Sequence, residues 1–297
     1  MNIARSLECH QARGLTALLL LGVSVFLTPL SALGDSGVLA RIALSQKIRI
    51  AYPENSYPIA FKDEDGLPRG YSVDLCRRIV ASIQRDLGLD GIAISWIEGN
   101  TPRRLAAVAN GEAELDCGTT TMTLSRQQKV DFSYPIFVES GGILVLKNAG
   151  IGSLADLGGK AIGVIPETTT EHRLRPVLAE RLINAELKPI KDAKDGREQL
   201  LAGAIDAFAD DRLVLIGQVA ASGKTNAYQV IDTDFSVDPY ALALSRDDAD
   251  FRLAVNRGLA QIYASEEIDR IFARWFGDDA QPTPLLDSIY FIFALQD

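Results

Sequence analysis

A run of hydroxyl-bearing residues that ends in an arginine is the part of this sequence best suited to binding a small anion. Residues 116–126 read DCGTTTMTLSR and are predicted to leave a strand and enter a short helix. Hydroxyls and backbone N–H groups at such a turn suit a carboxylate, which an arginine can hold through two parallel hydrogen bonds. Ordinary helix capping, with Arg126 on the surface, is the alternative interpretation.

A local repeat predicts a second polar loop opposite the first. Residues 109–116 (ANGEAELD) resemble residues 201–208 (LAGAIDAF), and each is a helix end, a glycine and a strand that runs into a polar loop. In open α/β sheets, ligands bind outside the carboxyl ends of the strands. Two such units, one per lobe, are therefore expected to place two polar loops across one cleft.

The order of the elements that position these loops indicates an α/β protein. Strands are expected at 48–52, 92–97 and 114–117, with helices at 72–87 and 102–109 between them. This βαβαβ order predicts a mainly parallel sheet with helices on both faces. The pattern then restarts. Further strands are expected at 142–147, 161–165, 186–190, 205–209 and 240–244. Further helices are expected at 168–182, which a capping box at Thr168 opens, at 195–202 and at 211–221, and two more between about 248 and 275.

We predict two lobes from this restart. The first lobe is assigned residues 35–138 and 239–297, and the second residues 139–238. Two crossings then join them, and Gly141–Gly142 and Asp238–Pro239 are the hinge candidates.

The first 34 residues have the layout of a secretory signal peptide. Arg5 and Arg13 form a basic start, residues 15–30 are almost wholly apolar, and small residues near Gly34 suit cleavage. An uncleaved membrane anchor is the alternative, although the apolar run is shorter than the roughly 18–20 residues of a spanning helix. Export predicts a periplasmic protein.

Composition excludes several functions. The net charge of −9 opposes nucleic-acid binding, which needs a basic footprint. His172 is the only histidine beyond the predicted leader, so we expect neither a metal site nor triad chemistry. Cys76 and Cys117 form either one disulfide or two buried thiols, and the sequence leaves both open. The phosphate-loop-like run SGKT at 222–225 lacks the required upstream glycine.

Several short motifs together resemble one protein family, the bacterial periplasmic solute-binding proteins for polar amino acids (extracellular solute-binding family 3), and most closely its glutamate/aspartate-like branch. The resemblance runs from about Lys47 to Trp275 and implies a two-lobed, type II periplasmic-binding-protein fold. The matching segments are SYPIAF at 56–61, GYSVDL at 70–75, NG at 110–111 with Asp116, TTTMTLSR at 119–126, VDFS at 130–133 with Pro135, GV at 163–164 with TT at 168–169, and GAIDAF at 203–208.

The resemblance assigns roles to polar residues. Arg126 matches the arginine that binds the ligand α-carboxylate, and Asp210 matches the aspartate that receives the α-ammonium. A solvated helix cap beside Asp211 is the alternative for Asp210. The contacts to the ligand backbone match threonines: Thr119 and Thr121 in the first lobe, and Thr169 with Thr168 at a helix N-terminus in the second.

Specificity follows less directly from the resemblance. Arg104 matches a position that meets the ligand side chain in the acidic-amino-acid branch, and a surface arginine is the alternative. Tyr57 and Phe61 are expected to line the pocket, with core packing as the alternative for each. Departures from the branch argue against strict glutamate selectivity: Pro53 stands where a second arginine is expected, Ala193 replaces a polar residue, and Pro166–Glu167 replace a small residue and glycine.

The resemblance implies the substrate-binding component of an ABC transporter, a non-enzyme without cofactor. It is expected to be a monomer that closes on a free polar amino acid (glutamate, aspartate, glutamine or similar) and delivers it to an inner-membrane permease. The alternatives are a ligand-sensing protein for a signalling receptor and a periplasmic amino-acid dehydratase on the same fold.

Overall fold

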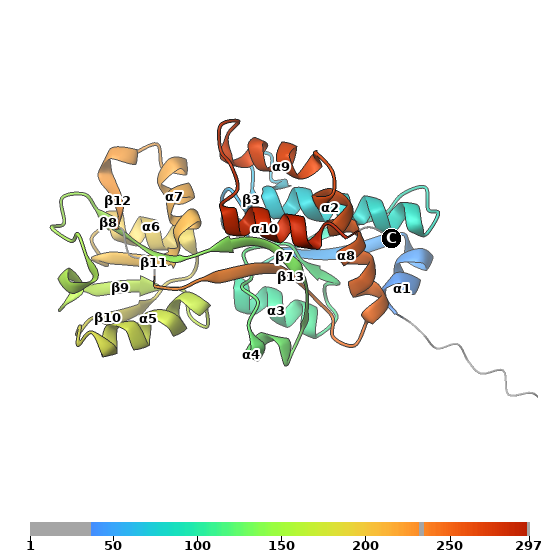
Figure 1. Cartoon of the computed structure of the whole chain (residues 1–297). Coiled ribbons are helices and arrows are strands. Elements are labelled where there is room, and N and C mark those ends of the chain that lie inside the picture. The colour runs from blue at the N-terminus through green and yellow to red at the C-terminus, as the bar shows by residue number, and fades with distance from the viewer. Residues whose placement is uncertain (1–36, 232–234, 296–297) are drawn as a thin grey trace, which may run out of the picture. The chain divides into compact units, whose positions relative to one another are not determined.

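The computed structural model describes residues 37–231 and 235–295 (Figure 1). The predicted signal peptide, residues 1–34, lies outside the described residues. Within the described ranges, no helix is both long and apolar enough to cross a bilayer.

The first sheet has the strand order β5-β1-β6-β13-β7. Its strands are β1 (Lys47–Tyr52), β5 (Ala93–Glu98), β6 (Leu115–Asp116), β7 (Asp131–Glu139) and β13 (Asp238–Leu244). β1 pairs in parallel with β5 and β6, with Ile50 opposite Trp96 and Leu115. β13 runs antiparallel to both β6 and β7, so one strand of five is reversed.

Side chains that alternate along β1 feed two different cores. Ile48 and Ile50 belong to a large core with α1 (Val38–Ser45), α2 (Tyr71–Asp86), α8 (Ala249–Tyr263), α9 (Glu267–Phe276) and α10 (Pro284–Phe293). Ala51 points to the opposite face, where α3 (Thr101–Ala109) packs. Because successive side chains of a strand point to opposite faces, the apolar residues of β1 can pack against helices on both faces of the sheet, as Figure 1 shows.

The second sheet repeats this plan with the strand order β10-β9-β11-β8-β12. Its strands are β8 (Gly141–Leu146), β9 (Ala161–Val164), β10 (Glu186–Pro189), β11 (Ala207–Asp211) and β12 (Tyr228–Ile231), and again one strand, β8, is reversed. Helix α5 (Thr169–Glu180) covers one face, and α6 (Ala193–Leu201) and α7 (Arg212–Ala221) cover the other. Short 3-10 helices lie at Leu154–Leu157 and Thr225–Ala227. The predicted α/β fold of two sheet-containing lobes is confirmed.

The chain crosses between the two sheets twice. β7 ends at Glu139 and β8 begins at Gly141, while β13 starts at Asp238 after the return from β12. The two crossings lie side by side, because Asp238 pairs with Glu139. Rotation of the lobes about these crossings stays a prediction.

Several elements were not expected from the sequence. These are α1, α10, β7, β12 and a small antiparallel sheet of β2 (Asn55–Ser56), β3 (Ala60–Lys62) and β4 (Pro68–Arg69). The short helix that was predicted after the strand ending near residue 116 is α4 (Leu124–Gln127). The predicted capping box of α5 forms only in part. Thr168 accepts from the N–H of Glu171, but the Glu171 carboxylate accepts from the N–H of Glu167.

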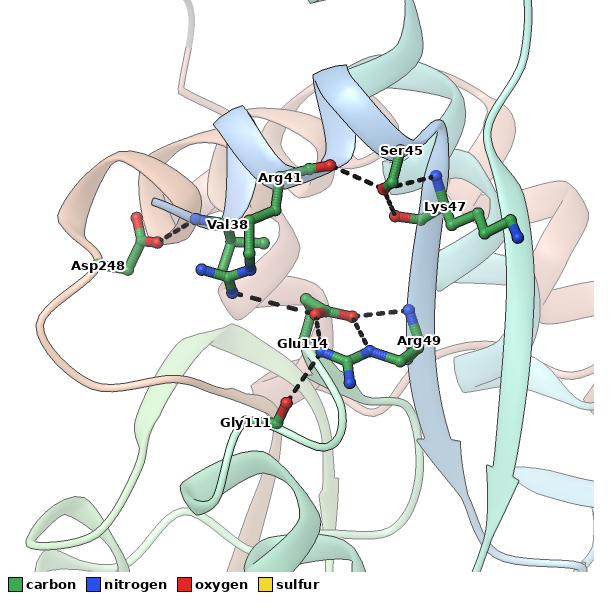
Figure 2. A network of polar contacts seen from close by, with 8 residues as sticks. All are labelled: Val38, Arg41, Ser45, Lys47, Arg49, Gly111, Glu114 and Asp248. Atoms are coloured by element: carbon green, nitrogen blue, oxygen red, sulfur yellow. Dashed lines mark hydrogen bonds and ion pairs between the residues drawn. The ribbon is translucent and has the colours of Figure 1, made fainter. Parts of the chain in front are cut away.

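Two interactions fix the strand that leads into the site. A disulfide joins Cys76 of α2 to Cys117, directly after β6, with 6.3 Å between the Cα atoms, which settles the alternatives left open by the sequence. At the other end of β6, Glu114 is 5% exposed and accepts hydrogen bonds from the Arg49 N–H (2.7 Å) and Nη2 (2.5 Å) (Figure 2). These contacts hold β6 against α2 and β1.

Candidate functional site

A cavity of about 330 Å³ is lined by loops that follow the parallel strands of both sheets. Residues of the first lobe come from the ends of β1 and β5, from β2, from the loop after β6, and from α3 and α4. Residues of the second lobe come from the ends of β9, β10 and β11. The carboxyl ends of parallel strands are where ligands bind in open α/β sheets. The lining residues are Pro53, Glu54, Asn55, Ser56, Glu98, Gly99, Asn100, Thr101, Arg104, Thr119, Arg126, Ile165, Thr168, Thr169, Thr170, Lys191, Asp192, Ala193, Asp210 and Asp211.

Arg126 is held at this cavity by a loop that is tied to the crossing strand. Thr121 forms a β-bridge with Tyr240 of β13, and Thr123 caps α4 by accepting from the N–H of Arg126. The Arg126 Nη1 donates to the Thr121 carbonyl at 2.8 Å. Burial lowers the pKa of Arg126, and the nearby charge of Arg104 lowers it further. Within residues 37–231 and 235–295 it forms no ion pair, so an anion in the cavity would complete its contacts.

Asp210 and Asp211 place two carboxylates on the opposite side of the cavity. Both are buried, at 8% and 7% exposed, so the solvated-cap alternative for Asp210 is excluded. Burial raises the pKa of Asp210 well above its ordinary value, and the charge of Asp211 adds to this. Burial also raises the pKa of Asp211, to about 7. Tyr240 and Thr170 donate hydrogen bonds to the Asp211 carboxylate, which favours its ionised form.

The predicted threonines divide into two groups. Thr119, Thr168 and Thr169 line the cavity. Thr121 is 1% exposed and is not among the lining residues, but its hydroxyl lies 3.2 Å from that of Thr169. Thr121 therefore joins the Arg126 loop of the first lobe to the α5 N-terminus of the second.

Arg104 lines the cavity from within a buried ion pair. It is 1% exposed, which excludes the surface alternative, and its Nε donates to Asp116 Oδ1 at 2.8 Å. Nη1 donates to the Gly99 carbonyl at 3.0 Å. Nη2 donates to the hydroxyls of Thr101 (3.3 Å) and Thr120 (3.1 Å). The guanidinium is thus fixed before any ligand arrives.

The structure does not bring Tyr57 and Phe61 to this cavity. Their rings pack edge to face, with centroids 5.1 Å apart, and Phe61 packs in the same way on Trp275 at 5.7 Å. Tyr57 is 36% exposed. Their placement fits the packing alternative that the sequence left open.

The sequence interpretation missed several acidic lining residues. Asp211 was considered only as a neighbour of Asp210. Glu54, Glu98 and Asp192 were not considered, although all three follow predicted parallel strands, which is the signal that could have found them. Lys62 bridges Glu54 (3.1 Å) and Glu98.

A second cavity, of about 800 Å³, adjoins the first and shares Arg126 and Thr169 with it. It lies among α3, α4 and α5. Its ionisable residues are mainly basic, namely Lys129, His172 and Arg173, with Glu167 as the one carboxylate among its described lining residues. Of these two cavities among the described residues, the smaller one sets a cation opposite several carboxylates, an arrangement that suits an amino-acid zwitterion.

Two α/β lobes around this polar cavity define the type II periplasmic-binding-protein fold. Residues 48–278 match the bacterial extracellular solute-binding proteins, family 3, and the chain belongs to this family. It is 30% identical over 250 residues to the L-glutamate/L-aspartate-binding protein of Pseudomonas aeruginosa, covering 84% of this chain and 82% of that one. It is 29% identical over 272 residues to the glutamate/aspartate import solute-binding protein of Escherichia coli, covering 91% and 90%.

Among solved structures, the chain resembles an ancestral arginine-binding protein bound to glutamine. The TM-score is 0.69 at 26% identity, and the match covers 78% of this chain and 98% of that one. The predicted family, its glutamate/aspartate-like branch and the fold are therefore confirmed.

Proposed function

We propose that this protein is the periplasmic substrate-binding component of an ABC importer and captures a free polar amino acid with an acidic or amide side chain. The observation that carries the proposal is that Arg126 of one lobe and Asp210 and Asp211 of the other line the same cavity. A free amino acid has one fixed anion and one fixed cation, and this cavity offers a partner for each.

The α-carboxylate binds Arg126, together with Thr119 and the N-terminus of α5 at Thr169. Helix N-termini favour anions because their first N–H groups are unpaired. The α-ammonium binds Asp210 and Asp211. Charge-assisted hydrogen bonds contribute about 1.5–3 kcal/mol each. Four or five of them, after ordering costs, reach the roughly 8 kcal/mol of micromolar affinity.

Ligand binding favours closure because the two ends of the zwitterion have their partners on different lobes. A ligand shifts a conformational equilibrium by its differential affinity for the two states. Contacts between the lobes already exist at the cavity: Gln218 donates to the Asn55 carbonyl at 2.6 Å, and Tyr240 donates to Asp211. The closed form then docks, as a monomer, on an inner-membrane permease.

The relatives support this role, because proteins similar over most of their length are named for glutamate and aspartate binding or import. The Cys76–Cys117 disulfide supports an oxidising compartment such as the periplasm. The family consists of solute-binding proteins, which favours binding over catalysis. A dehydratase would need an acid or base placed over the substrate, and Glu167, a candidate for this role, lines the larger cavity and not the smaller one.

A thermal-shift screen of the purified mature protein against the twenty amino acids tests the proposal. Binding stabilises the folded state by RT ln(1 + [L]/Kd), so a micromolar ligand at millimolar concentration adds about 4 kcal/mol. We expect a large shift with one or a few polar amino acids. Absence of a shift with all twenty would contradict the proposal, and conversion of a stabilising amino acid into product would favour the dehydratase instead.

A further inference from the structure

The hydrogen bonds of Arg104 leave it little capacity for a ligand. A guanidinium has five N–H groups. Four of those of Arg104 are directed to Asp116, Gly99, Thr101 and Thr120. Its charge is offset by Asp116, which is 0% exposed and receives a second hydrogen bond from Thr120. One N–H on Nη1 remains, and it can donate to a single ligand oxygen.

Three carboxylates line the cavity besides Asp210 and Asp211: Glu54, Glu98 and Asp192. Lys62 lies between Glu54 and Glu98, so one cation faces two carboxylates. The hydrogen bond from Lys62 holds the pKa of Glu98 below its ordinary value, and Glu98 is therefore ionised at neutral pH. Asp192 accepts from the N–H of Asp195 at 3.0 Å as the cap of α6.

The remaining cations of the cavity are Arg126, which the α-carboxylate occupies, and Lys191. Lys191 is exposed, so water screens its charge, as it also partly screens Glu54 and Glu98, whose side chains are 38% and 43% exposed. With Arg104 offset by Asp116, the surroundings of the ligand side chain contain more carboxylate than cation. A second carboxylate on the ligand would enter a field of its own sign.

We infer that this cavity selects a carboxamide side chain over the isosteric carboxylate, because Arg104 is committed to Asp116 while Glu54, Glu98 and Asp192 line the same space. This inference rests on the proposed function and narrows it to glutamine-type ligands. The amide oxygen accepts the remaining Nη1–H of Arg104. The amide nitrogen donates its two N–H groups to the cavity carboxylates, a contact that a ligand carboxylate cannot make.

Glutamine and glutamate form the matched pair for the test, since they differ only in this group. Isothermal titration of the wild-type protein at pH 7.5 gives both dissociation constants, by displacement where one ligand binds weakly. Unit charges several ångströms apart in a partly hydrated cavity change an equilibrium constant by about tenfold. We expect glutamine to bind at least about tenfold more tightly than glutamate.

Two charge-removing variants locate the cause. Glu98→Gln preserves the shape of the side chain, and Asp192→Asn preserves the helix cap. Each is expected to lower the ratio of glutamate to glutamine dissociation constants by about threefold or more. Glu112→Gln is the matched control, because Glu112 forms an exposed ion pair with Arg103 at 2.6 Å and is absent from the cavity lining.

Glutamine preference that falls in Glu98→Gln and Asp192→Asn but not in Glu112→Gln supports the inference. The inference is overturned if glutamate binds the wild-type protein as tightly as glutamine does. It is also overturned if the ratio of the two dissociation constants is the same in the wild type and all three variants. In both cases the proposed function is unaffected, because the protein still binds an amino acid. If none of the twenty amino acids binds the wild-type protein, the proposed function fails, and this inference fails with it.

Discussion

Arg104 and Asp116 form an ion pair, 2.8 Å from Nε to Oδ1, in which neither side chain is more than 1% exposed. Asp116 ends β6, and Arg104 lies on α3, which packs across the sheet from α2. The pair therefore joins the loop after β5 to the loop that leads to Arg126. Its position beneath the cavity makes it part of the scaffold of the site as well as part of its lining.

The first prediction concerns the stability of this pair. Arg104→Ala leaves Asp116 buried without its cation, and breaking a buried pair in this way costs about 3–5 kcal/mol. Urea denaturation of the ligand-free protein should show this loss. Arg103→Ala, which removes an exposed pair with Glu112, should cost less than about 1 kcal/mol. Equal effects of the two variants would mean that the Arg104–Asp116 pair is not buried in solution.

The second prediction separates the two cavities. Arg126→Ala should abolish the thermal shift caused by amino acids, because the α-carboxylate loses its only guanidinium, whereas Arg126→Lys should keep part of it. Lys129→Ala should leave the shift unchanged, since Lys129 lines only the larger cavity. Loss of the shift in Lys129→Ala together with its survival in Arg126→Ala would place the ligand in the larger cavity.

The third prediction is that ligand affinity falls in acid. Asp211 has a pKa of about 7, raised by burial, and must be ionised to receive the α-ammonium. Binding therefore releases a proton below pH 7, and the dissociation constant should rise by up to about tenfold per pH unit there. Glutamine is the suitable ligand because its side chain does not titrate. Titrations from pH 5 to 8 that give a constant affinity would contradict the assignment.

The fourth prediction concerns the stability of the ligand-free protein, which should fall as the pH rises because buried carboxyl groups must then ionise. Glu139, at the first crossing, also has a pKa raised to about 7 by burial. A carboxyl with a raised folded-state pKa contributes stability that is present below its unfolded pKa and is lost as pH rises through 7. The free energy of unfolding should thus decline from pH 5 to pH 8, and Glu139→Gln should flatten the decline. An unchanged slope in this variant would exclude Glu139 as a source.

The fifth prediction concerns the approach of the lobes. A Cβ atom added to Gly217 of α7 would lie 1.9 Å from the backbone oxygen of Tyr57 in the first lobe. Gly217→Ala should therefore hold α7 away from this loop and weaken ligand binding by about tenfold or more, although Gly217 does not line the cavity. Ile216→Ala, on the exposed side of the same helix, is the control. Unchanged affinity in Gly217→Ala would show that closure does not need this contact.

The fold was predictable where local pattern and tertiary packing agree. Helix α2 begins and ends within one residue of the prediction, and the apolar residues spaced along one face, Val73, Cys76, Ile79, Val80 and Ile83, are all buried. β7 was not predicted because it contains Pro135 and pairs antiparallel with β13, about a hundred residues away, so no local repeat signals it. Helix α10 was not predicted, because it follows the last segment whose sequence pattern indicated a helix. It packs on the core of the first lobe.

The candidate site was predictable in its residues more than in its connections. Arg126, Asp210, Thr119, Thr168 and Thr169 all line one cavity. The partner of Arg104 was not predictable, because Asp116 lies twelve residues away on a different element and only the folded sheet brings the two together. The same holds for the hydrogen bond from Tyr240 to Asp211, which joins residues of two lobes.

The central claim is that both ends of a free amino acid are held at once, the carboxylate by Arg126 and the ammonium by Asp210 and Asp211. Isothermal titration of the wild-type protein with its best amino acid and two analogues, one lacking the α-carboxylate and one lacking the α-ammonium, tests it most directly. Each analogue loses one pair of charge-assisted hydrogen bonds, so we expect each to bind at least about a hundredfold more weakly than the parent amino acid. Binding of either analogue within a few fold of the parent amino acid would contradict the account.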